Sequence, residues 1–166
     1  MVLGNVLWIG GGCGAGKSTL ARMLAYRNDL RLYRVDSFAY PHESRADALR
    51  HPEMTRLAGL THAERFAQPT PERLAADFTA HAAERFEMIV DDLAKLADGP
   101  VVIAEGPSLL PELVAPLAAS PGHAIWLLPT TEFTDRNLAS RYDPRRGDAE
   151  AASRHRKRVG RDRLLT

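Results

Sequence analysis

Residues 11–18 read Gly-Gly-Cys-Gly-Ala-Gly-Lys-Ser and match the pattern G-x-x-x-x-G-K-[ST] at every defined position. Glycines allow a backbone to wrap closely around a ligand, so that successive N–H groups point inward. In this pattern the lysine reaches the β- and γ-phosphates of a nucleotide, and the hydroxyl binds Mg²⁺. The sequence therefore predicts a phosphate-binding loop with contacts from Gly11, Gly12, Cys13, Gly14, Ala15, Gly16, Lys17 and Ser18.

The segments on either side of the loop have the order that such a loop requires. Residues 5–9 predict a short buried strand, and residues 19–26 predict an amphipathic helix with Leu20, Met23 and Leu24 on one face. A glycine-rich turn that binds nothing would not explain a lysine and a serine at the start of a helix.

Composition indicates an ordinary globular chain. The 166 residues are 45% hydrophobic and 26% charged, which is enough for one α/β domain with its own core. The single cysteine, Cys13, lies in the loop and leaves no intrachain disulfide, which fits a reducing, cytoplasmic setting. No apolar run approaches 18 residues and the N-terminus has no signal-peptide pattern, so we expect neither a membrane span nor a leader.

Further strands and helices alternate along the chain. Strands are expected at residues 30–35, 101–104 and 123–128, with 101–104 central because it is continuously apolar. Thr70 predicts a helix N-cap, with Pro71 at the first helical position of a helix that ends near residue 97. Alternation of this kind predicts an α/β fold with a central parallel sheet flanked by helices. Shorter helices are expected at residues 44–51, 61–67, 111–117 and 131–142, and a basic helix from about residue 148 to the end.

With these features the chain resembles the P-loop small-molecule kinases of the nucleoside monophosphate kinase-like superfamily. The resemblance rests on residues 11–18, on Asp36 after the second strand, and on Arg136 and Arg141 in a helix after the fourth strand. It covers most of the chain and implies a three-layer P-loop NTPase fold. The chain departs from the family in one respect: no apolar β run follows Leu128, so the usual fifth strand is absent or lies beyond the sequence, which leaves the adenine site in doubt.

The resemblance implies a role for each of these groups. Asp36 stands where a parallel sheet opens to its ligands, and would orient or deprotonate an acceptor hydroxyl, with a possible part in binding Mg²⁺. The alternative is that Asp36 caps the next segment. Residues 131–150 would form a lid whose arginines cover the transferred phosphoryl group, with Arg141 ranked first, then Arg136, then Arg145.

Two further residues were assigned near the nucleotide. Glu105 follows the third strand directly, in the place of a carboxylate that binds Mg²⁺, and the alternative is a salt bridge at the strand end. Thr19 would contact the α-phosphate, or is simply a residue of the first helical turn. The metal ligands expected are thus Ser18, Asp36 and Glu105.

Residues 37–100 are expected to bind the acceptor. The candidates are Tyr40, His42, Arg45 and Arg73, whereas His62 and His81 are read as surface residues. No pair of histidines or cysteines has the spacing of a zinc site.

Charge is unevenly distributed along the chain. Residues 136–166 hold ten basic and four acidic residues, although the net charge of the whole chain is only +1. This basic segment is read as a cluster that closes over phosphates, and the alternative is a solvated or nucleic-acid-binding arm.

The leading hypothesis is a single domain, residues 1–166, that uses ATP and Mg²⁺ to phosphorylate a hydroxyl of a small molecule. The alternative is an ATP-binding regulatory module or ATPase without a small-molecule acceptor. A third possibility, phosphorylation of nucleic-acid ends, requires a basic surface continuous with Asp36.

Overall fold

The computed structural model describes residues 2–141 and 149–165, without the side chains of residues 138, 141 and 149. Arg145 therefore lies outside the described residues, and so does the side chain of Arg141. The strands are β1 (Val6–Gly11), β2 (Arg31–Arg34), β3 (Val102–Glu105) and β4 (Ala124–Leu127). The helices are α1 (Lys17–Asn28), η1 (Val35–Phe38), α2 (Ala39–Arg45), α3 (Pro52–Ala58), α4 (His62–Phe66), α5 (Pro71–Ala94), α6 (Pro111–Val114), η2 (Pro121–His123), α7 (Thr131–Arg141) and α8 (Ala149–Leu164).

The four strands form one parallel sheet in the order β2-β3-β1-β4. All four residues of β3 are buried, as its apolar sequence predicts for a strand with neighbours on both sides. The described residues contain no fifth strand in this sheet. The structure thus confirms the expected α/β class with a parallel sheet flanked by helices.

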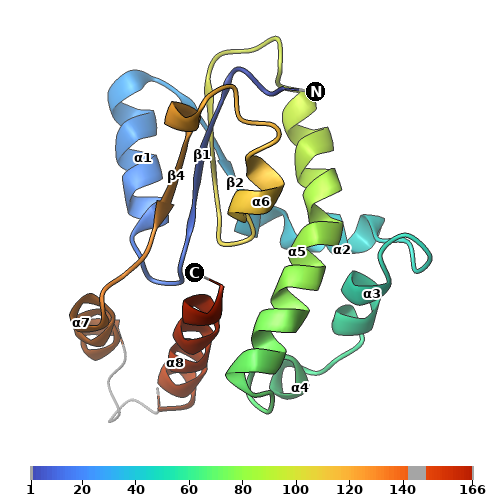
Figure 1. Cartoon of the computed structure of the whole chain (residues 1–166), viewed down its shortest axis with the longest axis vertical. Coiled ribbons are helices and arrows are strands. Elements are labelled where there is room, and N and C mark those ends of the chain that lie inside the picture. Colours follow the sequence, from blue (N-terminus) through green and yellow to red (C-terminus); the bar gives the residue numbers. More distant parts are fainter. Residues whose placement is uncertain (1, 142–148, 166) are drawn as a thin grey trace.

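Helices cover both faces of the sheet (Figure 1). On one face, Ile9 and Ile103 pack against Ala21 and Ala25 of α1. On the other face, a larger cluster contains Trp8, Val102 and the α5 residues Phe86, Ile89 and Leu93. Because successive strand residues point to opposite faces, both layers draw on the same short strands.

The buried face of α1 differs from the expected one. Ala21 and Ala25 face the sheet, whereas Met23 is 48% and Leu24 36% exposed. Small side chains let the helix lie close to the strands, so helical periodicity among larger residues pointed to the wrong face.

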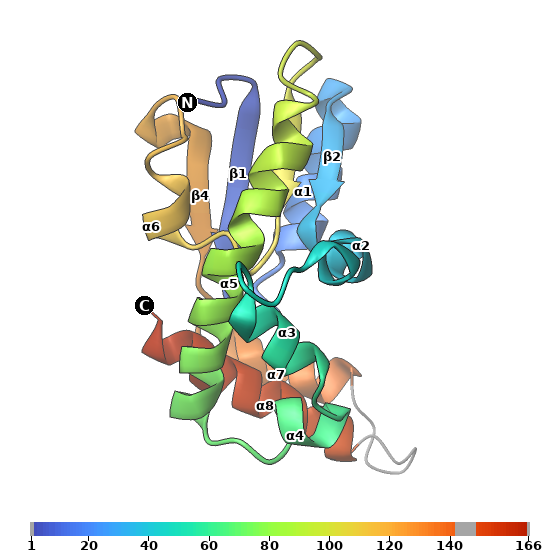
Figure 2. The same cartoon turned by 90° about the vertical axis from the view of Figure 1, so that its right-hand side faces the viewer.

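The long helix α5 begins as its sequence predicts. The Thr70 hydroxyl accepts a hydrogen bond from the Arg73 N–H, and Pro71 occupies the first turn, where its missing N–H is not needed. Figure 2 shows α3, α4 and α8 beside the lower half of α5, near the end of the sheet where the strands finish, and Figure 1 places α7 on the other side of α8.

The helix expected at residues 44–51 does not form. Helix α2 ends at Arg45, and the Asp47 carboxylate then accepts hydrogen bonds from the N–H groups of Leu49 and Arg50 in a turn. Pro52 disfavours helical geometry at the preceding residue and instead starts α3. The turn chemistry of Asp47 therefore prevails over helix propensity.

Candidate functional site

The loop between β1 and α1 has the geometry of an anion site. Gly16, the N-cap of α1, has a φ of 92°, and Gly11 has a φ of 112° with the Leu127 carbonyl where a Cβ would stand. Both positions require glycine. Lys17 is buried and its Nζ donates a hydrogen bond to the Gly12 carbonyl at 2.6 Å, so the ammonium group is held inside the loop.

The hydroxyl of Ser18 meets the carboxylate at the end of β3. Ser18 Oγ donates to Glu105 Oε2 at 3.1 Å, and Glu105 is 4% exposed. The other oxygen of Glu105 lies 3.7 Å from Arg34 Nε. Both interpretations of Glu105 therefore describe a real contact: it forms a salt bridge at the strand end, and it also stands beside the candidate metal-binding hydroxyl.

A cavity of about 200 Å³ opens over the loop. Its lining includes Lys17, Ser18 and Thr19 from the loop and α1, together with Asp36 and Glu105. Of the residues expected to contact phosphate or metal, residues 13–19, Asp36 and Glu105 line this space, whereas Gly11 and Gly12 do not.

A second cavity, of about 360 Å³, lies next to the first and shares Cys13, Asp36 and Pro107 with it. It extends between the end of the sheet, α5 and α8, and its walls combine arginines with the rings of Phe66 and Phe78. A ligand in this space would face a ligand on the loop across Asp36.

Asp36 is exposed and lies on η1, directly after β2. Its carboxylate caps no helix, because α2 and η1 have no side-chain cap. Among the described residues none forms a hydrogen bond or ion pair with this carboxylate, which leaves it available in the wall between the two cavities.

The helix α7 touches the loop through a residue that the sequence analysis did not select. Asn137 Nδ2 donates to the Gly14 carbonyl at 3.0 Å. Arg136 is exposed on this helix and lines neither of the two cavities. A lid role for Arg136, Arg141 and Arg145 thus stays a prediction.

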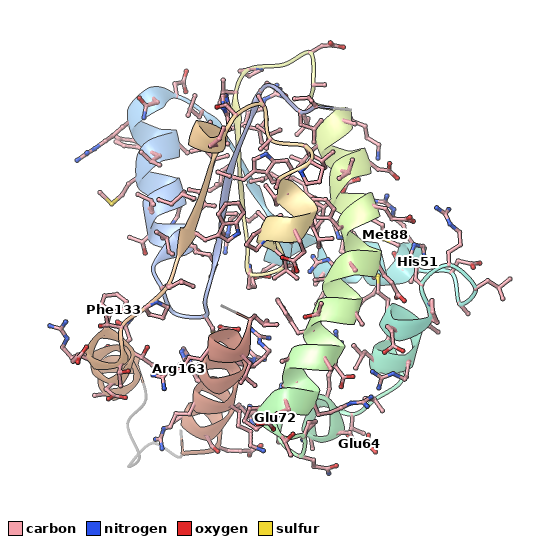
Figure 3. All side chains as sticks on the ribbon, viewed as in Figure 1. His51, Glu64, Glu72, Met88, Phe133 and Arg163 are labelled. Atoms are coloured by element: carbon pink, nitrogen blue, oxygen red, sulfur yellow. The ribbon has the colours of Figure 1, made fainter. Side chains whose placement is uncertain are left out.

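The basic helix α8 lies over the loop and lines the second cavity. Asp162 accepts a hydrogen bond from the Cys13 N–H, and Arg158 and Arg161 line the cavity wall. The opposite side of α8 is tied to α7, because Arg163 donates to the Thr131 hydroxyl at 3.0 Å (Figure 3). One feature of the sequence indicated this arrangement, the dense positive charge of residues 136–166.

Most of the candidate acceptor residues lie outside the second cavity. Tyr40 is 83% exposed, Arg45 pairs with Asp92, and Arg73 pairs with Asp77; none of the three lines the second cavity. His42 is fully buried behind that cavity.

Instead, Arg65, His81 and Arg85 line the cavity from α4 and α5. His81 had been read as a surface residue, but burial, with the neighbouring cations Arg65 and Arg85, lowers the pKa of His81 to about 4. Its imidazole is therefore neutral near neutral pH. The pattern of α5 hints at this: residues 74, 78, 81 and 85 follow helical spacing on one face.

Burial also shifts the ionisable groups of the loop. Desolvation lowers the pKa of Lys17, although Cys13, Asp162, Asp36 and Glu105 act in the opposite direction. Burial, followed by the charge of Asp162, raises the pKa of the Cys13 thiol. A thiol kept protonated is a poor nucleophile, which agrees with a packing role for this residue.

The oxygen atoms near the loop fit a bound Mg²⁺. This ion usually binds one or two protein oxygens and completes its shell with waters and phosphate oxygens, so Ser18 with Glu105 or Asp36 is a sufficient set. No group of three or more histidine, cysteine, aspartate or glutamate side chains among the described residues could hold a metal by itself.

The fold and the site define a class: a parallel α/β protein whose glycine loop adjoins a second cavity lined by arginines and aromatic rings. No protein-family model matches the sequence, and no curated protein matches it at a significant level. None of the described helices is both long and apolar enough to cross a membrane.

Proposed function

We propose that the chain has a P-loop kinase-like fold and is an ATP- and Mg²⁺-dependent phosphotransferase that acts on a hydroxyl of a small molecule. The observation that carries this proposal is the pair of adjoining cavities that share Asp36. One space is lined by the phosphate-binding loop, and the other is large and polar enough for an acceptor.

In the proposed reaction the acceptor oxygen attacks the γ-phosphorus of ATP, and the bond from that phosphorus to the β–γ bridging oxygen breaks. ADP leaves with the bond's electron pair, and the hydroxyl proton passes to Asp36 and then to water. Lys17 and the loop N–H groups hold the phosphates at the N-terminus of α1, where the helix dipole favours anions.

Mg²⁺ would neutralise charge on the β- and γ-phosphates while Ser18 and Glu105 hold it in place. The chain itself contributes position and charge. Phosphoryl transfer depends mainly on these two factors, so the exposed Asp36 carboxylate need only orient the hydroxyl and accept its proton.

The same cavity weighs against the alternative of a regulatory ATP-binding module. A module without an acceptor predicts that side chains fill the space beside Asp36, whereas a cavity of about 360 Å³ lies there. We therefore favour a transferase, in which transfer to water, that is hydrolysis of ATP, would be a side reaction.

The test is a transfer assay with Mg²⁺, γ-labelled ATP and pooled hydroxyl compounds, read by mass. We expect a labelled small molecule with the wild type and a loss of about 100-fold in turnover with Asp36→Asn, because this substitution removes the base but keeps the shape. Asp98→Asn, an exposed carboxylate after α5, serves as the matched control.

Binding of ATP without any labelled product in the pool would favour the regulatory module. Turnover that survives Asp36→Asn unchanged would contradict the assigned base while leaving the loop's role intact.

A further inference from the structure

Arg85 is a buried cation that forms no ion pair with a carboxylate of the described residues. It is 4% exposed and lines the second cavity from α5. Its Nε donates to His42 Nδ1 at 2.9 Å, and its Nη2 donates to the Val35 carbonyl. Both acceptors are neutral, and no carboxylate of the described residues lies within ion-pair distance of the guanidinium. A buried charge is costly unless an opposite charge compensates it.

Arg85 is held by a chain of hydrogen bonds. Because His42 Nδ1 accepts from Arg85, the ring proton must be on Nε2, which donates to Asp92 Oδ2 at 3.0 Å. Asp92 also accepts from the Tyr33 hydroxyl at 3.1 Å and from Arg45 at 2.9 Å. The fork of Arg85 is thus fixed in direction, and two of its five N–H donors are used by the residues that the structure describes.

Other cations line the same space. Arg158 of α8 has no ion pair with a described residue, and its guanidinium lies 4.8 Å from the centre of the Phe66 ring. Arg65 pairs with Glu43 at 3.1 Å, and its guanidinium lies 5.2 Å from the centre of the Phe66 ring. The walls therefore present fixed, partly desolvated guanidinium groups.

The acidic side chains of the cavity do not balance these cations. Asp77 is occupied by two arginines outside the lining, Arg56 at 2.5 Å and Arg73 at 3.0 Å. Asp36 remains: it lies at the junction with the loop cavity and forms no ion pair with Arg85, although its negative charge acts on that guanidinium. The cavity is thus positive away from Asp36.

We infer that the acceptor carries an oxyanion group, a carboxylate or a phosphate or sulfate ester, which Arg85 and Arg158 bind while its hydroxyl faces Asp36. The inference rests on the proposed function, because it takes the second cavity as the acceptor site. The oxyanion supplies the negative charge that would pair with Arg85. The hydrogen-bonded His42 and Asp92 hold the Arg85 guanidinium in position. A planar guanidinium fork matches an oxyanion with two parallel hydrogen bonds.

The test measures binding of simple oxyanions, apart from turnover. Inorganic phosphate, sulfate and malonate are titrated separately, with calorimetry and thermal unfolding as readouts. All proteins carry Lys17→Ala, which weakens anion binding at the loop. We expect Arg85→Gln and Arg158→Gln each to raise the dissociation constant about tenfold or more, as for loss of a charge-assisted contact. The tightest of the three anions indicates the acceptor's anionic group.

Arg73→Gln is the matched control, since it removes the same charge from the same helix at a position outside the cavity. If Arg85→Gln does not fold, Arg158→Gln decides. Anion affinity that is equal in the cavity variants and in Arg73→Gln, or no anion binding at all, would overturn the inference.

Binding of ATP and Mg²⁺ to the wild type is measured in parallel, so that the two proposals fail separately. Oxyanion binding that depends on Arg85, without any binding of ATP, would contradict the kinase proposal alone. ATP binding together with an anion affinity that Arg85→Gln does not change would contradict the oxyanion inference alone.

Discussion

Two side chains, Ser18 and Glu105, meet at the point where a metal would join the phosphates. They come from segments 87 positions apart, yet each could be selected from its local motif. Asp36 was found in the same way, from its place after a strand. Residues at the carboxyl ends of parallel strands are thus predictable, because topology brings them to one edge of the sheet.

Replacement of Ser18 by alanine removes one metal-binding oxygen but leaves the loop N–H groups in place. We expect the Mg²⁺ concentration for half-maximal transfer to rise about tenfold, which is the smaller effect reported for loss of a supporting ligand. A magnesium titration at saturating ATP measures this, with Ser44→Ala on α2 as the control. An unchanged titration would show that Ser18 does not bind the metal.

His81 makes stability depend on pH. Its pKa is about 4 in the folded chain against an ordinary value of 6.5. Between these values the unfolded chain binds a proton that the folded chain excludes, so the free energy of unfolding falls as pH decreases through this window. His81→Gln should remove roughly 2 kcal/mol of that decrease between about pH 7 and about pH 5.

Urea unfolding of both proteins at the two pH values measures the effect, and His62→Gln on the exposed helix α4 is the control. An equal pH dependence in the wild type and His81→Gln would contradict the assigned burial.

At the scale of elements, α8 is the part that sequence reasoning placed least well. Its length and charge were predicted, but not its contacts. Arg161 lies 3.9 Å from the centre of the Phe78 ring, Gly160 faces Pro71, and Lys157 donates to the Pro69 carbonyl at 3.3 Å. These contacts join positions about 80 to 90 apart, and no local pattern encodes such pairing.

Asp162 of α8 holds a loop N–H that a phosphate oxygen would otherwise use. Asp162→Asn removes a negative charge beside a highly charged ligand, so we expect ATP to bind about fivefold more tightly, which corresponds to roughly 1 kcal/mol. Calorimetry with ATP and Mg²⁺ measures the change. Glu150→Gln on the same helix is the control, since Glu150 pairs with Arg154 and lies outside both cavities.

Weaker binding in Asp162→Asn, with an unchanged unfolding temperature, would instead mean that the carboxylate organises the loop for its ligand. The direction of the change in ATP affinity thus shows whether Asp162 competes with the phosphates or organises the loop for them.

For the whole molecule, the positive charge of the C-terminal region is directed inward more than composition suggests. Arg161 is buried and pairs with Asp162, while Arg154 pairs with Glu150. Charge counts along the sequence describe amount but not direction. Among the described residues of this segment, Arg158 and Arg161 line the second cavity, whereas Arg136, Arg156 and Arg163 are exposed.

We accordingly expect only weak binding of single-stranded oligonucleotides, with a dissociation constant above about 10⁻⁴ M at physiological salt. Fluorescence anisotropy at two salt concentrations measures it. Tight, salt-sensitive binding that Arg158→Gln weakens would revive phosphorylation of nucleic-acid ends as the function.

The shared wall at Asp36 has a practical consequence. Under the proposed function, water would reach the same carboxylate and the same γ-phosphate whenever the second cavity is empty, and the protein should then release inorganic phosphate slowly. A compound that fits the cavity would displace this water and change the rate of phosphate release, whether or not its own phosphorylation can be detected. Phosphate release from the resting protein thus becomes a reporter for finding the natural acceptor among unlabelled compounds.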